Sequence, residues 1–171
     1  PPNAAAYGHA KRRMEAAAQA AHGAVTCLRI GNVAGCDALL GPKRTAATGA
    51  SHAPRLHIFA HGKGPERSYI GPESFARVLA SLTMAAHLDT APPLPPVLNL
   101  ALSGWLDMAD LLRAAGIAYD PVPAPREAIA RVALSTHRLA ELVPLSPVWS
   151  GAERVIDEWE RDKERVNSLI N

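Results

Sequence analysis

The chain has 171 residues, enough for one domain with a substantial hydrophobic core. Hydrophobic residues make up 48% of it and charged residues 20%, the ordinary balance of a folded globular protein. The net charge of +2 is spread along the sequence, which argues against a nucleic acid or an anionic membrane as partner.

Membrane-spanning and disulfide-rich classes find no support in the sequence. The longest uncharged run, APPLPPVLNLALSGWL, contains four prolines and suits a membrane helix poorly. No signal-peptide pattern opens the chain, so we expect a cytoplasmic protein. The two cysteines, Cys27 and Cys36, are expected to be buried free thiols in a reducing cytosol, with a structural disulfide as the alternative.

The predicted elements alternate between helices and strands. An alanine-rich helix that ends before Gly23 leads into a short apolar strand, and residues 35–54 have the composition of a long loop. Expected strands are 24–30, 55–60, 67–70 and 97–101. Expected helices are 4–22, 71–88, 105–116, 135–142 and 151–170. This order predicts an α/β fold, in the form of the trailing half of a doubly wound sheet plus a small α-rich lobe.

Three helices carry more specific signals. In helix 71–88, Pro72 suits the first turn, and Ser135 is the expected N-cap of helix 135–142. The expected inward stripe of helix 71–88 is Phe75, Val78, Leu79 and Leu82. That of the last helix is Val155, Ile156, Trp159, Val166, Leu169 and Ile170.

Tyr7 and Lys11 are four residues apart in the first helix, so they share one face. A free tyrosine has a pKa of about 10, and a nearby ammonium favours its phenolate. Such a tyrosine can take a proton from a substrate hydroxyl while hydride leaves the same carbon. An ordinary surface pair explains the same spacing.

Two further stretches place polar side chains beside strands. Asn32 follows an apolar strand in LRIGNVAG, where open α/β sheets bind ligands, although Gly and Asn are also usual turn residues. Arg67 follows the turn of HGKGPERSYIG, and a guanidinium binds phosphate with two hydrogen bonds. A solvated surface arginine is the alternative.

Other chemistries lack support in the sequence. His57 and His61 have the spacing of metal ligands on a helix, but they fall on a predicted strand and turn. Ser103 and Ser150 lack matching His and Asp partners for a hydrolase triad. The chain contains neither a phosphate-binding P-loop nor a complete glycine-rich dinucleotide fingerprint.

Five stretches, in this order, resemble the extended short-chain dehydrogenase/reductases, the NAD-dependent epimerase/dehydratase family. YGHAK resembles the family's Tyr-x-x-x-Lys motif, and CLRIGNVAG resembles its Leu-Arg-x-x-Asn-x-x-Gly strand and loop. GKGPERSYIGPESFARVL resembles its Gly-x-x-x-Arg-Asp-Tyr-Ile-His-Val-x-Asp-Leu-Ala segment. PVLNLALSG and RVALSTHRLAELVPLSP resemble a later strand and a near-terminal segment, so the likeness covers residues 4 to 150.

The resemblance implies roles for seven residues. Tyr7 would be the catalytic acid/base, and Lys11 would lower its pKa and hold the nicotinamide ribose of NAD or NADP. Ile30 and Val33 would line the nicotinamide pocket. The expected substrate-binding residues, for a nucleotide-sugar diphosphate, are Asn32, Arg67 and Arg126.

The resemblance also implies an organisation of the chain. Residues 1–34 would end the dinucleotide-binding domain, and residues 35–171 would form mainly the substrate-binding lobe, with strand 97–101 returning to the sheet. The family's glycine-rich loop and catalytic Ser/Thr precede the tyrosine, so we expect these 171 residues to be a C-terminal half that binds NAD weakly alone. Small residues on the first helix, Ala5, Ala16, Ala17 and Ala20, favour a homodimer.

Departures from the family pattern leave the substrate and the activity open. Ser68 stands where the family often has Asp, Gly71 and Pro72 replace His and Val, and Ser74 replaces a second Asp. The alternative to an epimerase, dehydratase or reductase is a relative that binds a nucleotide or a partner without turnover.

Overall fold

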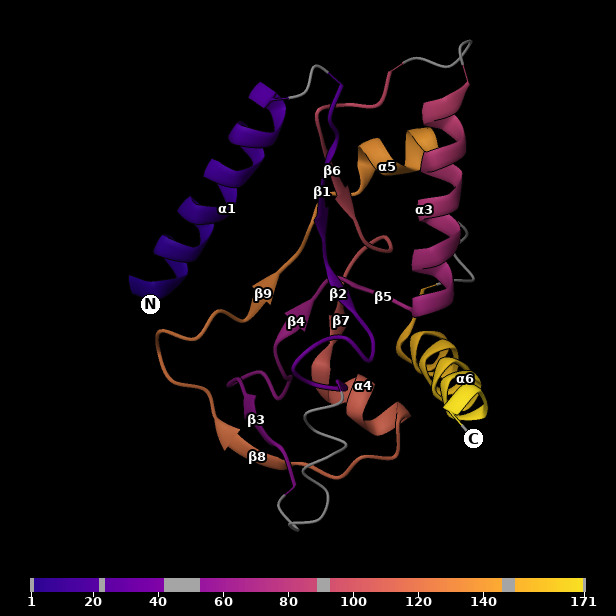
Figure 1. The fold of residues 1–171 in the computed structure, drawn as a ribbon. Coiled ribbons are helices and arrows are strands. Elements are labelled where there is room, and N and C mark those ends of the chain that lie inside the picture. Colours follow the sequence, from indigo (N-terminus) through magenta and orange to yellow (C-terminus); the bar gives the residue numbers. More distant parts are fainter. Residues whose placement is uncertain (1, 22–23, 42–52, 89–92, 146–149, 171) are drawn as a thin grey trace.

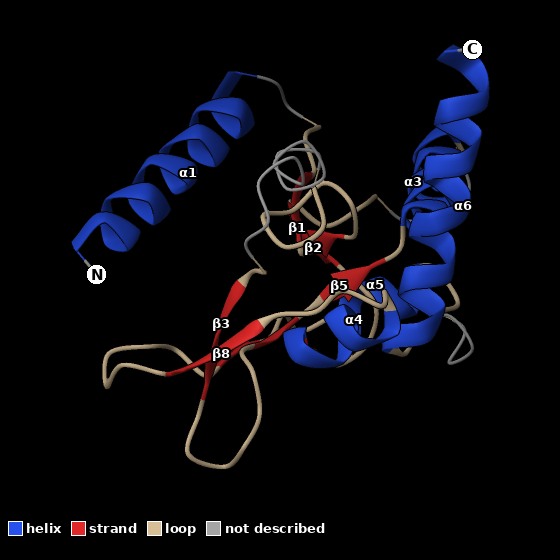
Figure 2. Cartoon of the chain, turned by 90° about the horizontal axis from the view of Figure 1, so that it is seen from below, coloured by secondary structure: helices blue, strands red, loops and turns tan. Residues whose placement is uncertain are grey.

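A computed structural model of the chain describes residues 2–21, 24–41, 53–88, 93–145 and 150–170. A long helix, α1 (Pro2–Ala21), stands on one side of the parallel strands β1 (Cys27–Ile30) and β6 (Val97–Leu100) (Figure 1). The helices α3 (Pro72–His87) and α6 (Ala152–Ile170) lie on the other side, as the view from below confirms (Figure 2). Within the described ranges, no helix is long and apolar enough to cross a bilayer.

The remaining strands are short and pair in small groups. β2 (Asn32–Val33) runs parallel to β5 (Tyr69–Ile70), and β3 (Arg55–Ile58) runs parallel to β8 (Asp120–Pro123). β4 (Glu66–Arg67) is the centre of a three-stranded sheet. It pairs antiparallel with β7 (Leu106–Asp107) and parallel with β9 (Arg131–Val132).

The core lies between the β1–β6 strands and the helices α3, α4 (Met108–Ala114), α5 (His137–Leu142) and α6. α3 begins at Pro72, as its fixed φ favours, and its expected apolar stripe packs into this core. α4 begins where Asp107 accepts a hydrogen bond from the backbone N–H of Ala109 at 2.8 Å.

Polar contacts of Glu158, Arg161 and Arg165 join α6 to the first turn of α3. Glu158 is 1% exposed, and its carboxylate accepts hydrogen bonds from Ser74. Glu73 accepts two hydrogen bonds from the guanidinium of Arg161, at 3.1 and 3.2 Å. A Cβ at Gly71 would lie 2.2 Å from Oε2 of Glu158, so the close approach of the helices needs glycine there.

Several sequence predictions need correction. α5 begins at His137 with Thr136 as its N-cap, and no side chain caps it, so the expected cap at Ser135 is wrong. The expected inward stripe of α6 holds as far as Trp159, whereas Val166 is 45% exposed and Leu169 is 81% exposed because the helix extends past the core.

The cysteine prediction is right about pairing and wrong about burial. Both thiols are free, but Cys27 is only half-buried and Cys36 is exposed. Cys36 lies in the turn after β2, where its backbone N–H bonds to the carbonyl of Val33 at 3.0 Å.

Candidate active site

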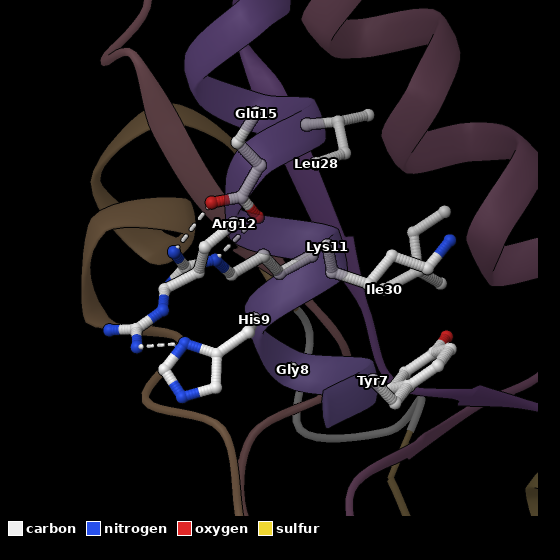
Figure 3. A pocket seen from close by; sticks show the side chains of 9 residues that line it. Tyr7, Gly8, His9, Lys11, Arg12, Glu15, Leu28 and Ile30 are labelled. Carbon is white, nitrogen blue, oxygen red and sulfur yellow. Dashed lines mark hydrogen bonds and ion pairs between the residues drawn. The ribbon is translucent and has the colours of Figure 1, made fainter. Parts of the chain in front are cut away.

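A hollow of about 720 Å³ lies between α1 and β1 (Figure 3). Its lining includes one ammonium, two guanidinium groups, one carboxylate and one phenol, together with apolar side chains. They are Tyr7, Gly8, His9, Lys11, Arg12, Glu15, Leu28, Arg29 and Ile30. The first six lie on α1 and the last three on β1, so the helix and the strand form its two walls.

Tyr7 and Lys11 share one face of α1, and both side chains point to the side on which Ile30 lies (Figure 3). The Nζ of Lys11 lies 5.6 Å from the centre of the Tyr7 ring. Tyr7 is 67% exposed, so its hydroxyl is open to a ligand. A phenol and an ammonium therefore lie side by side on the wall of a hollow that is accessible from outside.

Glu15 and Arg29 form a two-point ion pair across the hollow. The guanidinium of Arg29 donates from Nε to Oε1 at 2.9 Å and from Nη2 to Oε2 at 2.7 Å. These hydrogen bonds lower the pKa of the Glu15 carboxyl and raise the pKa of Arg29. Sequence analysis missed both residues, although Glu15 continues the spacing of Tyr7 and Lys11 by another four residues.

β1 continues into β2 through the single residue Gly31. This connection determines where the predicted site residues Ile30, Asn32 and Val33 lie. Ile30 is 48% exposed and lines the hollow. The backbone N–H of Gly31 bonds to the carbonyl of Leu100, and that of Asn32 bonds to the carbonyl of Ser68, both at 2.9 Å. A Cβ at Gly31 would lie 2.8 Å from the same Ser68 oxygen, so the two segments approach at backbone distance.

Asn32 and Val33 lie outside the hollow as the described residues define it. Val33 packs against the hydrophobic core. Asn32 is half-buried and lies beside Tyr69, its partner in the β2–β5 pairing, and the Tyr69 hydroxyl donates to Asp37 at 2.5 Å. Burial raises the pKa of Tyr69 well above its ordinary value, and Asp37 adds to the effect. Asn32 therefore lies beside an internal polar pair rather than in the hollow beside Tyr7.

Arg67 uses its guanidinium to hold a neighbouring loop. Nη1 donates to the carbonyls of Glu66 at 2.7 Å and Ala130 at 3.2 Å, and Nη2 donates to that of Ile129 at 3.0 Å. Three of its five N–H groups are thereby used. Burial lowers the pKa of Arg67. Arg126 is exposed on the turn of the same loop, where the N–H of Ala128 bonds to the carbonyl of Pro125.

A second cluster is formed by Glu66 on β4, Arg131 on β9 and Trp105, which immediately precedes β7. The buried carboxylate of Glu66 accepts a hydrogen bond from Nε of Arg131 at 2.5 Å, and the Arg131 guanidinium lies 3.9 Å from the centre of the Trp105 ring. The hydrogen bond from Arg131 lowers the pKa of Glu66. Sequence analysis missed this cluster because Glu66 and Arg131 are 65 residues apart along the chain.

Among the described residues, neither His57 nor His61 forms an ion pair with an acidic side chain or belongs to a possible metal-binding group. His57 lies on β3, and His61 stacks on Phe59 with ring centres 5.8 Å apart. In the described part of the chain, no three His, Cys, Asp or Glu side chains are grouped closely enough to hold a metal ion.

Comparison with known proteins finds similar folds among solved structures but no similar sequence. The sequence matches no family model and no curated protein. Among solved structures, the chain resembles a UDP-glucose 4-epimerase from Stenotrophomonas maltophila with bound NAD and formylated UDP-arabinopyranose. The TM-score is 0.62 at 16% identity, over 92% of this chain and 54% of that one.

Two further neighbours give the same result. A UDP-glucose 4-epimerase from Bifidobacterium longum, in complex with NAD⁺ and UDP, has a TM-score of 0.53 at 15% identity, over 82% of this chain and 48% of that one. An NAD-dependent NDP-hexosamine 5,6-dehydratase has a TM-score of 0.51 at 18% identity, over 78% and 45%.

These neighbours confirm the α/β, Rossmann-type fold class that the sequence predicted. The chain spans about half the length of the solved proteins that it matches.

Proposed function

We propose that the chain is part of an NAD(P)-dependent epimerase, dehydratase or reductase that acts on a carbinol carbon of a nucleotide-sugar. The observation that carries the proposal is the pairing of Tyr7 and Lys11 on one face of α1, beside an open hollow. In this reading Tyr7 moves the proton of the reacting hydroxyl, and the Lys11 ammonium lies beside its ring.

The residues around the hollow suit the nicotinamide-ribose end of the cofactor. The ammonium of Lys11 is a donor for ribose hydroxyls, and the exposed side chain of Ile30 offers an apolar surface to a flat ring. When bound, the cofactor supplies the hydride transfer, and the protein supplies orientation and proton transfer. Val33, which faces the core, would contribute indirectly by fixing β2 behind Ile30.

On the substrate side, we assign the diphosphate to Arg67 and Arg126. Arg67 retains two N–H groups after holding the loop, and Arg126 is exposed on that loop. Asn32 would serve this site by fixing Tyr69. We further propose that residues 1–34 belong to the dinucleotide-binding unit and residues 35–171 mainly to the substrate-binding lobe, with β6 beside β1.

Replacement of Tyr7 tests the proposal in the full encoded protein. Tyr7→Phe removes the hydroxyl and should reduce turnover of a UDP-sugar by at least about 100-fold, with UDP affinity unchanged. The matched control is Tyr119→Phe, which removes a hydroxyl from a partly buried side chain outside the hollow and should keep normal turnover. Full activity of Tyr7→Phe would refute the assigned role.

A second candidate is a relative that binds a nucleotide or partner without turnover. The internal hydrogen bonds of Arg67 favour it, because they occupy groups that a substrate-binding site would leave open. Binding of UDP without turnover of UDP-glucose or UDP-galactose by the full encoded protein would support this candidate. Calorimetry of the 171-residue chain with NADH is a further test, and we expect no micromolar binding, since these residues contain no glycine-rich dinucleotide loop.

We also propose a homodimer. α1 exposes small side chains at Ala16, Ala17 and Ala20, which permit close helix approach. Sedimentation velocity should then give a dimer that Ala17→Arg dissociates, and a monomer at all concentrations would exclude it.

A further inference from the structure

α1 is attached to the rest of the chain only along its second half in the described structure. From residue 6 to residue 14, every side chain is exposed, and between residues 6 and 21 the partly buried positions are Glu15, Ala18 and Gln19. Gln19 donates to the carbonyl of Pro96 at 2.9 Å. Glu15 therefore makes the last contacts before the part of the helix that carries Tyr7 and Lys11. They are its two-point ion pair with Arg29 and a hydrogen bond from the Cys27 thiol to its backbone carbonyl.

The spacing of Tyr7, Lys11 and Glu15 links the ion pair of Glu15 to the rotational orientation of α1. Tyr7, Lys11 and Glu15 follow one another at intervals of four residues, so they form one stripe along the helix. A single hydrogen bond permits rotation of the helix about its axis, whereas two parallel hydrogen bonds from a planar guanidinium restrict it. Arg29 precedes Ile30 on β1, so the strand that fixes the stripe also supplies the opposite wall of the hollow.

We infer that Glu15 and Arg29 are positioning residues, which set the rotation of α1 on β1 so that Tyr7 and Lys11 face the hollow. The consequence for turnover rests on the proposed function, whereas the consequence for the orientation of Tyr7 does not. Misplacement of a reacting group by about 1 Å can reduce a rate by about 100-fold, so loss of the pair should lower kcat far more than it raises KM.

The orientation is measured by ¹⁹F NMR on the 171-residue chain labelled with 3-fluorotyrosine. The chain contains three tyrosines, and Tyr7→Phe assigns the Tyr7 resonance by removing it. We expect Arg29→Ala and Glu15→Ala to shift this resonance, and the charge-swapped double variant Glu15→Arg with Arg29→Glu to return it toward its original position. Should Arg29→Ala fold poorly, Arg29→Lys keeps the charge and removes only the planar, two-point geometry.

The matched control is Arg161→Ala. It breaks another two-point pair, with Glu73, which joins α3 to α6 on the other side of the β1–β6 strands. The Tyr7 resonance should keep its position in this variant. An unchanged resonance in both Glu15→Ala and Arg29→Ala would overturn the inference, and so would an equal shift in Arg161→Ala, which would indicate general loosening.

Kinetics on the full encoded protein complete the test. Arg29→Ala should lower kcat by about 100-fold with KM within a factor of two, and the charge-swapped variant should recover a large part of the loss. Should Tyr7→Phe itself retain activity, the proposed function fails and the NMR result alone decides the positioning role. A rise in KM with kcat unchanged would contradict the role in turnover.

Discussion

The carboxylate of Glu158 in α6 caps a different helix. It accepts hydrogen bonds from the backbone N–H of Ser74 at 2.8 Å and from the Ser74 hydroxyl at 2.7 Å, in the first turn of α3. The N-cap residue of α3, Gly71, has no side chain that can accept these bonds. A side chain more than 80 residues further along the chain therefore takes the role that a Ser or Asp beside the helix usually has.

Replacement of Glu158 should destabilise the fold. Glu158→Ala leaves a buried N–H and a buried hydroxyl of Ser74 without an acceptor, so we expect the free energy of unfolding to fall by about 3 kcal/mol. Urea denaturation measures this loss. Glu160→Ala, at an exposed position two residues away, should change stability by less than about 0.5 kcal/mol. Equal effects of the two variants would contradict the capping role.

Two glycine-to-alanine variants should change stability in opposite directions. Gly71→Ala places a methyl group against the Glu158 side chain and should cost about 2 kcal/mol. Gly8→Ala, inside α1 with no atom within 4 Å of the new Cβ, should stabilise by up to about 1 kcal/mol. Thermal unfolding of both compares them directly. A stabilising Gly71→Ala would show that α3 and α6 are further apart than described.

The contribution of the Glu66–Arg131 pair to the free energy of unfolding should decrease at acid pH. The pKa of Glu66 in the folded protein lies below its ordinary value of 4.5, mainly because Arg131 hydrogen-bonds the carboxylate. The pair therefore stabilises the fold fully above about pH 4.5 and loses its effect as the pH falls through the lowered pKa.

Urea denaturation between pH 7 and pH 3 tests this sign. The stability difference between the unmodified chain and Glu66→Gln should shrink as the pH falls. Arg131→Gln should show the same convergence, because it removes the cation that lowers the pKa. A difference that grows on acidification would contradict the assignment.

Arg67 and Arg126 should have separable effects on nucleotide binding. Arg67→Lys keeps a charge but loses the geometry that holds the carbonyls of Ile129 and Ala130, so we expect faster proteolysis of the loop together with about tenfold weaker UDP binding. Arg126→Ala should weaken UDP binding with no change in proteolysis, since Arg126 is exposed. Calorimetry and limited proteolysis give the two readouts. Weaker UDP binding by Arg67→Lys without faster proteolysis would point to direct contact alone.

Sequence reasoning succeeded where local pattern determines structure. The helical spacing of Val78 and Leu82, with Pro72 at the start, was sufficient to place α3 and its buried face. Short, mainly apolar stretches likewise placed β1 and β6. The shared face of Tyr7 and Lys11 follows from helical periodicity alone.

The failures concern structure that depends on distant partners. β8 contains Pro121 and Pro123, which argue against a strand, yet it pairs with β3 across more than 60 residues. The internal engagement of Arg67 depends on the carbonyls of a loop that no local signal connects to it. The roles assigned to Asn32 and Arg126 stay predictions for the same reason.

Gly31 connects the two ends of the candidate site through a single stretch of backbone. On one side it continues the strand wall of the hollow at Ile30, and on the other it lies against Ser68, the neighbour of Arg67. A methyl group at residue 31 would push against the Ser68 carbonyl and so disturb the Ile30 wall of the hollow and the segment that carries Arg67 together. Because residue 31 has no side chain, the backbone after Ile30 can lie directly against Ser68, so a displacement of one segment displaces the other.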